Sequence, residues 1–278
     1  MNDLTHFLGG AQVPGASGRF ADVYNPATGE AQYKCPMASA DETNAAIEAA
    51  AAAQPEWGAT NPQKRGRVMM ALVGLINRDM DKLAEALSRE HGKTLPDAKG
   101  DLQRGLEVIE YCIGAPQMLK GEYTDDAGPG IDMFSMRQPL GVVAAIMPFN
   151  FPAMMPLWHV GPALACGNAV VLKPSERDPS VPLMLAELFV EAGLPKGVFQ
   201  VVNGDKEAVD ALLDHELIEG VSFVGSTPIA QYIYARATAN GKRAQCFGGA
   251  KNHMIVMPDA DMDQAADALV GSGFGAAG

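Results

Sequence analysis

Residues 141–177 read GVVAAIMPFNFPAMMPLWHVGPALACGNAVVLKPSER, and the order of elements in this stretch decides the fold class. Gly141–Ile146 is a continuous apolar run, as expected of a strand that is covered on both faces. A helix is predicted from about Ala153 to Cys166, where Gly167-Asn168 end it, and Ala169–Leu172 is the next strand. A strand, a helix and a second strand in this order predict a right-handed crossover onto a parallel sheet.

The same alternation continues as far as Ala239. The further predicted elements are a helix over Val181–Ala192, a strand over Val198–Val202, a helix over Lys206–Leu213, a strand over Gly220–Val224 and a helix over Ile229–Ala239. The chain is therefore predicted to be an α/β protein. Ligands of such sheets bind beyond the carboxyl ends of the strands, so we expect the candidate site there.

The part of the chain before this region is predicted to be mainly helical. The first stretch, to about Tyr33, is rich in Gly and Pro and predicts irregular chain with short strands. Three helices are then predicted: from Ser39, which forms a capping-box pattern with Glu42, to about Gln54; from Asn61-Pro62 to near Gly92; and from about Pro96 to Leu119. Residues 121–137 change to Gly, Asp and alternating residues such as Ile131 and Met133, which predicts an inserted hairpin.

The bulk composition argues against several classes of protein. The chain has 278 residues, 47% of them hydrophobic, and a formal net charge of -12. Nucleic acids and anionic membranes select a basic surface, so neither is an expected partner. The N-terminus lacks the pattern of a signal peptide, and no apolar run approaches the ~20 residues of a membrane helix, so a cytoplasmic location is expected.

Cysteine and histidine spacing gives no metal site. The four cysteines, Cys35, Cys112, Cys166 and Cys246, are too far apart in sequence for a zinc knuckle or a redox pair, and a chain of this size needs no disulfides. The five histidines are scattered. No metal is therefore expected.

The C-terminal residues Gly273–Gly278 match the letters of the G-x-G-x-x-G dinucleotide fingerprint. That fingerprint requires a preceding strand and a following helix, whereas Met262–Val270 predicts a helix. We interpret this segment as a Gly-rich turn that approaches a site.

Three polar motifs follow predicted strands directly. In Met147–Pro152 two prolines bracket Asn150, whose amide could face a developing oxyanion or simply cap the next helix. In Lys173–Arg177 the Lys and Glu176 could hold ribose hydroxyls or form an ion pair in a solvated turn. In Phe223–Thr227, Gly225-Ser226 could approach a phosphate at a helix N-terminus or form an ordinary N-cap.

Together these motifs resemble the aldehyde dehydrogenase superfamily over nearly the whole chain. The resemblance implies that the parallel sheet is Rossmann-like and binds NAD without the usual Gly fingerprint. It implies that Asn150 is the oxyanion donor, that Lys173 and Glu176 contact the adenosine ribose, and that Gly225-Ser226 contact the pyrophosphate. Ala230 stands where the family usually has Gly. The residues implied to contact the cofactor are Met147, Phe149, Lys173, Glu176, Arg177, Gly225, Ser226 and Gly248.

Within the superfamily the chain is most similar to CoA-acylating methylmalonate-semialdehyde dehydrogenases. The similar stretches are PFNFPAMMP (148–156), KPSER (173–177), GAKNH (249–253) and FGAAG (274–278). Hydrolytic relatives carry a general-base Glu at the position of Phe247, and a Phe cannot deprotonate water. The resemblance therefore implies that coenzyme A, and not water, releases the acyl group. We assign no role to Cys246.

The same resemblance implies that Arg104 binds the substrate carboxylate, which suits the planar fork of a guanidinium. From the residues alone, a surface ion pair with Asp101 or Glu107 is the alternative.

The implied organisation is a NAD-binding domain over residues 1–120 and 138–251, an oligomerisation hairpin over 121–137, and the start of a truncated catalytic domain over 252–278. The family's nucleophilic Cys is expected just after Gly278, and none of the four cysteines matches it. The complete protein is expected to oxidise malonate or methylmalonate semialdehyde with NAD and CoA, as a homo-oligomer. The chain as written is expected at most to bind NAD. A hydrolytic aldehyde dehydrogenase, a non-catalytic NAD-binding protein and an unrelated α/β binding module are the alternatives.

Overall fold

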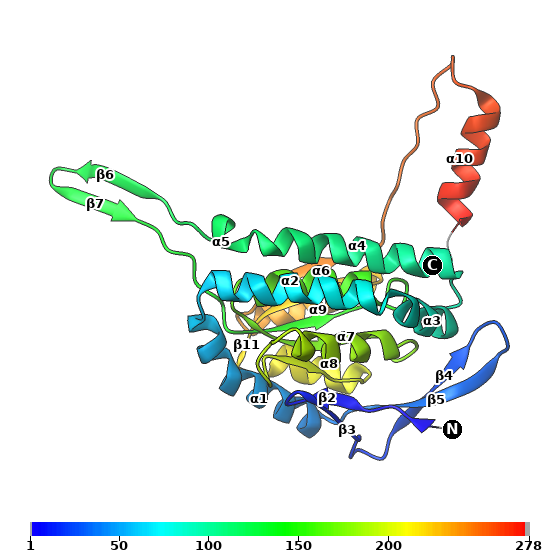
Figure 1. Ribbon diagram of the computed structural model, residues 1–278, viewed down its shortest axis with the longest axis horizontal. Coiled ribbons are helices and arrows are strands. Elements are labelled where there is room, and N and C mark those ends of the chain that lie inside the picture. Colours follow the sequence, from blue (N-terminus) through cyan, green and yellow to red (C-terminus); the bar gives the residue numbers. More distant parts are fainter. Residues whose placement is uncertain (1, 276–278) are drawn as a thin grey trace.

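A seven-stranded sheet forms the centre of the computed structural model, which describes residues 2–275 (Figure 1). Its strands, in spatial order, are β12 (Arg243–Phe247), β11 (Ile218–Val224), β8 (Val142–Ile146), β9 (Ala169–Lys173), β10 (Phe199–Val201), β2 (His6–Leu8) and β3 (Ala11–Val13). The five strands from β12 to β10 are parallel, while β2 and β3 add antiparallel. The predicted α/β class and parallel sheet are confirmed.

Helices cover this sheet in the way that right-handed crossovers require. The connections from β8 to β9 to β10 run through α6 (Met154–Ala165) and α7 (Ser180–Glu191). Those from β10 to β11 to β12 run in the opposite direction through α8 (Lys206–Asp214) and α9 (Thr227–Ala239), which places these two helices on the other face. The predicted helices of this half are confirmed to within about two residues.

The N-terminal helices begin where the sequence predicts and break where it does not. Ser39 and Glu42 form the predicted capping box at the start of α1 (Ala40–Ala59). The single helix predicted to end near Gly92 is two helices, α2 (Pro62–Arg78) and α3 (Met80–His91), because Asp79 leaves helical geometry at ψ 14°. The helix predicted to reach Leu119 likewise divides into α4 (Leu95–Ile113) and α5 (Ala115–Met118) at Gly114, a residue of low helix propensity.

The first residues form short strands, as predicted. A small sheet has the order β1 (Asn2–Asp3), β5 (Glu30–Pro36) and β4 (Phe20–Asn25). Strand β12, by contrast, was not predicted from the sequence. It lies at the edge of the large sheet, where its side chains alternate between exposed and half-buried, so it carries no continuous apolar run.

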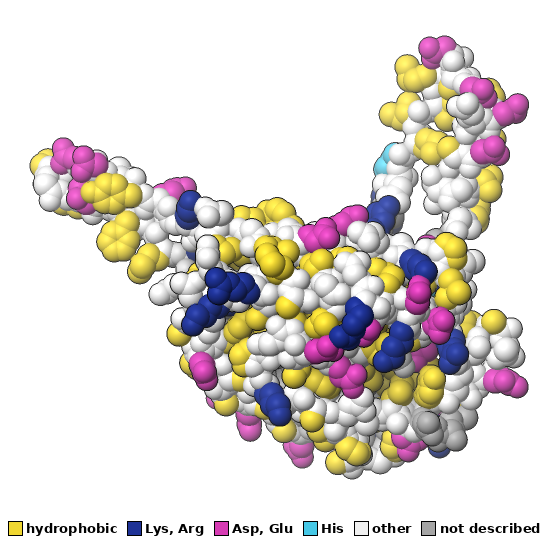
Figure 2. Space-filling view, viewed as in Figure 1, with side chains coloured by type: hydrophobic (Ala, Val, Ile, Leu, Met, Phe, Trp, Pro, Cys, Tyr) yellow, Lys and Arg dark blue, Asp and Glu magenta, His cyan; other side chains and the backbone are white. Residues whose placement is uncertain are grey.

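Two segments project from the body (Figure 1). One is the predicted hairpin, β6 (Tyr123–Gly128) paired with β7 (Ile131–Phe134), and the other is α10 (Met262–Phe274) at the end of an extended linker. Hydrophobic side chains gather on both segments in Figure 2. Phe134 of the hairpin is 71% exposed, and Phe274 of α10 is 85% exposed. Gly273 and Phe274 belong to α10, so the interpretation of this segment as a Gly-rich turn is wrong for these two residues. Residues 276–278 lie outside the described part of the chain.

None of the helices described over residues 2–275 combines the length and the apolar composition that crossing a membrane requires.

Candidate functional site

The predicted site residues gather at the edge of the sheet where the parallel strands end. Strands β8, β9, β11 and β12 end at Ile146, Lys173, Val224 and Phe247. Neighbouring strands lie about 4.8 Å apart, so the ends of β9 and β11, which flank β8, are separated by about 10 Å. The motifs that follow these strands therefore border one common region.

The loop after β8 carries Asn150. Met147 is buried, and its N–H donates to the carbonyl oxygen of Lys173 at 3.0 Å, which joins this loop to the end of β9. Helix α6 begins at Met154 with Ala153 at its N-cap, so the alternative that Asn150 caps this helix is wrong. The half-buried Asn150 amide has no hydrogen-bond partner among residues 2–275 and stays available to a ligand.

The loop after β9 carries Lys173 and Glu176. Lys173 is buried, and its Nζ donates to the carbonyl oxygens of Pro174 and Gly204. The Glu176 carboxylate lies 3.6 Å from Nζ with its side chain 38% exposed. Burial lowers the pKa of Lys173, which Glu176 opposes. The alternative of an ion pair in a solvated turn is thus wrong for the Lys, although the ion pair itself is present.

Phe149 and Arg177 complete this side of the site. The Arg177 guanidinium lies 4.9 Å from the centre of the Phe149 ring, and both side chains are exposed. They line one pocket together with Glu176, Glu90 and the buried carboxyl of Asp178.

The turn between β11 and α9 leaves donors unused. Ser226 occupies the N-cap position of α9, but its hydroxyl makes no capping hydrogen bond. The alternative of an ordinary N-cap is therefore right about where Ser226 lies and wrong about what its side chain does. Gly225 has no room for a side chain, because a Cβ would lie 2.4 Å from the Phe223 ring. A helix N-terminus with a free hydroxyl suits an anion such as a phosphate.

Strand β12 brings Phe247 and Gly248 to the same edge. The Phe247 side chain is 49% exposed, and its carbonyl oxygen accepts the Gly225 N–H at 3.1 Å. A Cβ on Gly248 would lie 2.8 Å from the Thr227 hydroxyl oxygen, so the chain passes close to the start of α9. The position of Phe247 thus holds no group that can accept a proton.

Arg104 is exposed on α4. The alternative of an ion pair with Asp101 or Glu107 is wrong for residues 2–275, because Asp101 faces inwards and pairs with Lys93. The carbonyl oxygen of Arg104 accepts the indole N–H of Trp158 on α6 at 2.9 Å. The guanidinium therefore stays free while its helix is fixed.

None of the four cysteines has the environment of a nucleophile. Burial raises the pKa of Cys35 and of Cys112 to about 12. Burial also raises the pKa of the half-buried Cys166 and Cys246. A reactive cysteine needs the opposite shift, since the thiolate is the nucleophile.

Sequence reasoning missed Lys93 and Asp101, which anchor the loop of Asn150. The Lys93 Nζ donates to the carbonyl oxygen of Asn150 at 2.8 Å and to Asp101 at 3.1 Å. The signal available was Lys93, just after the end of α3, and Asp101 among otherwise apolar core positions of α4, but only the fold reveals that both point inwards.

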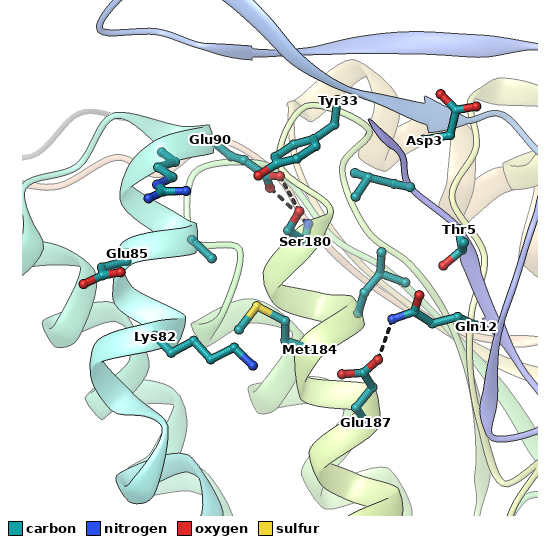
Figure 3. A pocket seen from close by; sticks show the side chains of 14 residues that line it. Asp3, Thr5, Gln12, Tyr33, Lys82, Glu85, Glu90, Ser180, Met184 and Glu187 are labelled. Carbon is teal, nitrogen blue, oxygen red and sulfur yellow. Dashed lines mark hydrogen bonds between the residues drawn. The ribbon is translucent and has the colours of Figure 1, made fainter. Parts of the chain in front are cut away.

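A second pocket lies between α3, α7 and the N-terminal strands (Figure 3). None of the predicted site residues lines it, and its Glu90 and Glu187 are already hydrogen-bonded to Ser180 and Gln12. Within residues 2–275 no group of three or more His, Cys, Asp and Glu side chains could hold a metal ion.

The residues at the sheet edge fit the donor set of a dinucleotide. The Glu176 carboxylate can accept hydrogen bonds from a ribose diol, and Lys173 holds it in place. The Ser226 hydroxyl and the first N–H groups of α9 can donate to a pyrophosphate. These two sets of groups lie two strands apart on the same edge.

The chain is similar to known proteins over nearly its whole length. The sequence profile of the aldehyde dehydrogenase family matches residues 13–278. The malonate-semialdehyde dehydrogenase of Pseudomonas aeruginosa is 55% identical over 278 residues, which are 100% of this chain and 56% of that protein. The mitochondrial acylating methylmalonate-semialdehyde dehydrogenase of Arabidopsis thaliana is 50% identical over 99% of this chain and 45% of its own length.

Solved structures share the fold closely. A protein from Sinorhizobium meliloti, crystallised in complex with NAD, has a TM-score of 0.97 and 64% identity over 99% of this chain and 56% of its own. The methylmalonate-semialdehyde dehydrogenase of Oceanimonas doudoroffii has a TM-score of 0.96 and 55% identity with the same coverage. The chain thus spans about half the length of the relatives it matches.

Proposed function

The chain belongs to the aldehyde dehydrogenase family, and from that premise we propose that the complete protein is a CoA-acylating semialdehyde dehydrogenase. It oxidises malonate or methylmalonate semialdehyde, reduces NAD, loses carbon dioxide and releases acetyl-CoA or propanoyl-CoA. The names of the relatives support the substrate class, and the NAD complex of a similar protein supports the cofactor.

The residues of this chain divide the work as follows. Arg104, free on the surface of α4, binds the carboxylate of the semialdehyde through paired charge-assisted hydrogen bonds. The unpaired amide of Asn150 donates to the oxygen that becomes negative when a thiolate attacks the aldehyde carbon. Because none of the four cysteines suits that attack, the thiolate comes from a cysteine outside this sequence.

The cofactor contacts follow from the fit at the sheet edge. Lys173 and Glu176 hold the ribose, Gly225 and Ser226 hold the pyrophosphate, and Met147, Phe149, Arg177 and Gly248 line the same region. When bound, NAD supplies the acceptor for the aldehyde hydride.

The proposal that the acyl group is transferred to CoA rests on one observation, the identity of the side chain at position 247, which is Phe. It lies at the carboxyl end of β12, half-exposed, at the position where hydrolytic relatives are expected to have a general base. Without a carboxylate there, water is not activated and the thioester persists until a CoA thiol attacks it.

The experiment is product analysis of the complete protein with malonate semialdehyde and NAD, with and without CoA. We expect acetyl-CoA formation and NADH turnover that depends on CoA. Phe247→Glu should raise release of the free acid without CoA by about tenfold or more. Rapid CoA-independent turnover of the unmodified protein would favour a hydrolytic dehydrogenase instead.

For the 278-residue polypeptide alone, we propose NAD binding without turnover, because its cysteines are protonated and buried or half-buried. Appearance of NADH with semialdehyde, CoA and NAD would contradict this. The division into a NAD-binding domain (1–120, 138–251), an oligomerisation hairpin (121–137) and the start of a catalytic domain (252–278), a homo-oligomeric state and a cytoplasmic location stay predictions.

A further inference from the structure

Lys93 and Asp101 form an ion pair that is almost completely buried. Their side chains are 1% and 0% exposed, and Nζ lies 3.1 Å from the carboxylate. Removing two charges from water is expensive, and hydrophobic residues in their place are often as stable or more so. Stability alone therefore does not explain the pair, and what it contacts becomes informative.

The pair holds the loop of Asn150 at three points. Lys93 donates to the carbonyl oxygen of Asn150 at 2.8 Å, and its ammonium lies 3.9 Å from the centre of the Phe151 ring. The other carboxylate oxygen of Asp101 accepts the N–H of Met154 at 2.7 Å, at the start of α6. One buried charge pair thus contacts Asn150, Phe151 and the first residue of α6.

The same carboxylate belongs to the helix that carries Arg104. One turn of α4 separates Asp101 from Arg104. Helix α4 is fixed against α6 by the Trp158 indole, which donates to the Arg104 carbonyl oxygen, and by Gly105, where a Cβ would lie 3.2 Å from the Met154 Cα. These contacts fix the position of α4, and with it Arg104 and Asp101, relative to the loop of Asn150.

We propose that Asp101, held by Lys93, is a positioning residue that sets where Asn150 lies relative to Arg104 and so selects aldehydes that carry a carboxylate. This inference rests on the proposed function, in which Asn150 contacts the carbonyl oxygen and Arg104 the carboxylate. A substrate bound at two points needs both groups in register, and misplacement by about 1 Å can reduce the rate by about a hundredfold. An uncharged aldehyde of the same length makes only the contact with Asn150.

The test compares two aldehydes in the complete enzyme, malonate semialdehyde and propanal. In Asp101→Asn the amide oxygen can still accept the Met154 N–H, but the charge that holds Lys93 is gone. We expect kcat/KM for malonate semialdehyde to fall by about tenfold or more, and that for propanal by less than about threefold. The Kd for NAD, measured by titration calorimetry, should change by less than about twofold, because Lys173 and Glu176, which hold the ribose, and Ser226 at the pyrophosphate lie on other loops.

A second variant covers the case in which Asp101→Asn does not fold. Asp101→Glu keeps the charge but lengthens the side chain by one methylene, so it should shift the loop and produce the same selective loss. The matched control is Asp81→Asn, which breaks the exposed ion pair between Lys99 on α4 and Asp81 on α3. It should leave the ratio of the two kcat/KM values unchanged.

Equal losses for the two aldehydes in the folded Asp101 variants would overturn the inference, since a general structural role predicts that result. Arg104→Gln separates this from failure of the proposed function. If it abolishes the preference for malonate semialdehyde, the function stands whatever the Asp101 variants do. If it leaves the preference intact, Arg104 does not bind the carboxylate and the proposed function fails with the inference.

Discussion

Two sets of buried carboxyl groups lie around helices α3 and α4, and the fold accommodates them in opposite ways. Asp101 is compensated by a cation, the ammonium of Lys93. Glu90 and Asp178 make no ion pair with any residue described over 2–275. Glu90 accepts hydrogen bonds from the backbone N–H and the hydroxyl of Ser180 (Figure 3), whereas both carboxyl oxygens of Asp178 lack a partner in the described chain.

The difference appears in their proton equilibria. Burial raises the pKa of Glu90 to about 7, and burial together with the nearby Glu90 raises the pKa of Asp178 to about 8. Burial also raises the pKa of Asp101, but Lys93 and the Met154 N–H oppose that rise. A carboxyl paired with a cation therefore fixes geometry, whereas one without a cation stays in the fold by keeping its proton.

The largest expected effect comes from leaving Asp101 without its cation. Lys93→Met should lower the free energy of unfolding by about 3–5 kcal/mol, since a buried charge then lacks a partner. Urea unfolding followed by circular dichroism measures this. Lys99→Met, which removes the exposed cation of the Asp81 pair, is the control and should change the value by less than about 1 kcal/mol. Equal effects of the two variants would mean that burial does not distinguish the pairs.

The next largest effect is a pH-dependent gain in the free energy of unfolding on Asp178→Asn. Because the folded pKa of about 8 lies above the unfolded value near 3.8, the folded protein retains a proton that the unfolded chain releases. Stability from this group is complete below about pH 4 and is lost progressively as the pH rises to about 8. An Asn cannot ionise and avoids that loss.

We therefore expect Asp178→Asn to be more stable than the unmodified protein by about 1–3 kcal/mol at pH 8.5 and to lose this advantage near pH 5. Thermal unfolding at both pH values measures it. The carboxyls near Asp178, those of Glu90, Asp101 and Glu176, are present in both proteins, so the difference between the two proteins is the quantity that reports on Asp178. An advantage that is independent of pH would show that Asp178 is ionised in the fold.

A smaller effect is expected from Ser180→Ala, which removes one of the two hydrogen bonds to Glu90. Since hydroxyl and backbone N–H both lower the pKa of this carboxyl, the variant should raise the pKa of Glu90 further. The loss of stability should be about 1 kcal/mol at pH 8 and less at pH 5, where a protonated Glu90 needs the bond less. Carbon-13 NMR of labelled Glu side chains measures the pKa directly, and an unchanged value would contradict the prediction.

The sequence predicted the sheet well because its strands depend on local pattern. Val142–Ile146 and Ala169–Lys173 are buried on both faces, so their apolar runs are continuous. Strand β12 was not predicted, because the side chains of this edge strand alternate between exposed and half-buried and form no apolar run. The helix breaks at Asp79 and Gly114 were not predicted either, because a single residue interrupts the helical pattern in each case.

The site was predictable where it follows strands, and it was not where it depends on distant contacts. Asn150, Lys173 and Ser226 come directly after strands, so parallel topology brings them to one edge. Lys93 meets the Asn150 carbonyl oxygen across 57 positions of sequence, and nothing in either local stretch indicates that contact. For the same reason sequence alone left open a surface ion pair between Arg104 and Asp101, which is wrong because Asp101 is buried and pairs with Lys93.

The smallest expected change in stability is that of Asn150→Ala. Lys93 holds Asn150 by its backbone carbonyl, and the side-chain amide has no partner among residues 2–275, so truncation removes no interaction of the fold. We expect the free energy of unfolding to change by less than about 0.5 kcal/mol. The same substitution should reduce turnover of the complete enzyme by about a hundredfold or more if the amide stabilises an oxyanion. A loss of stability above about 1 kcal/mol would instead mean that the Asn150 amide takes part in the network of Lys93 and Asp101. The distinction between the residues that hold the loop, Lys93 and Asp101, and the amide that the loop presents to a ligand would then disappear.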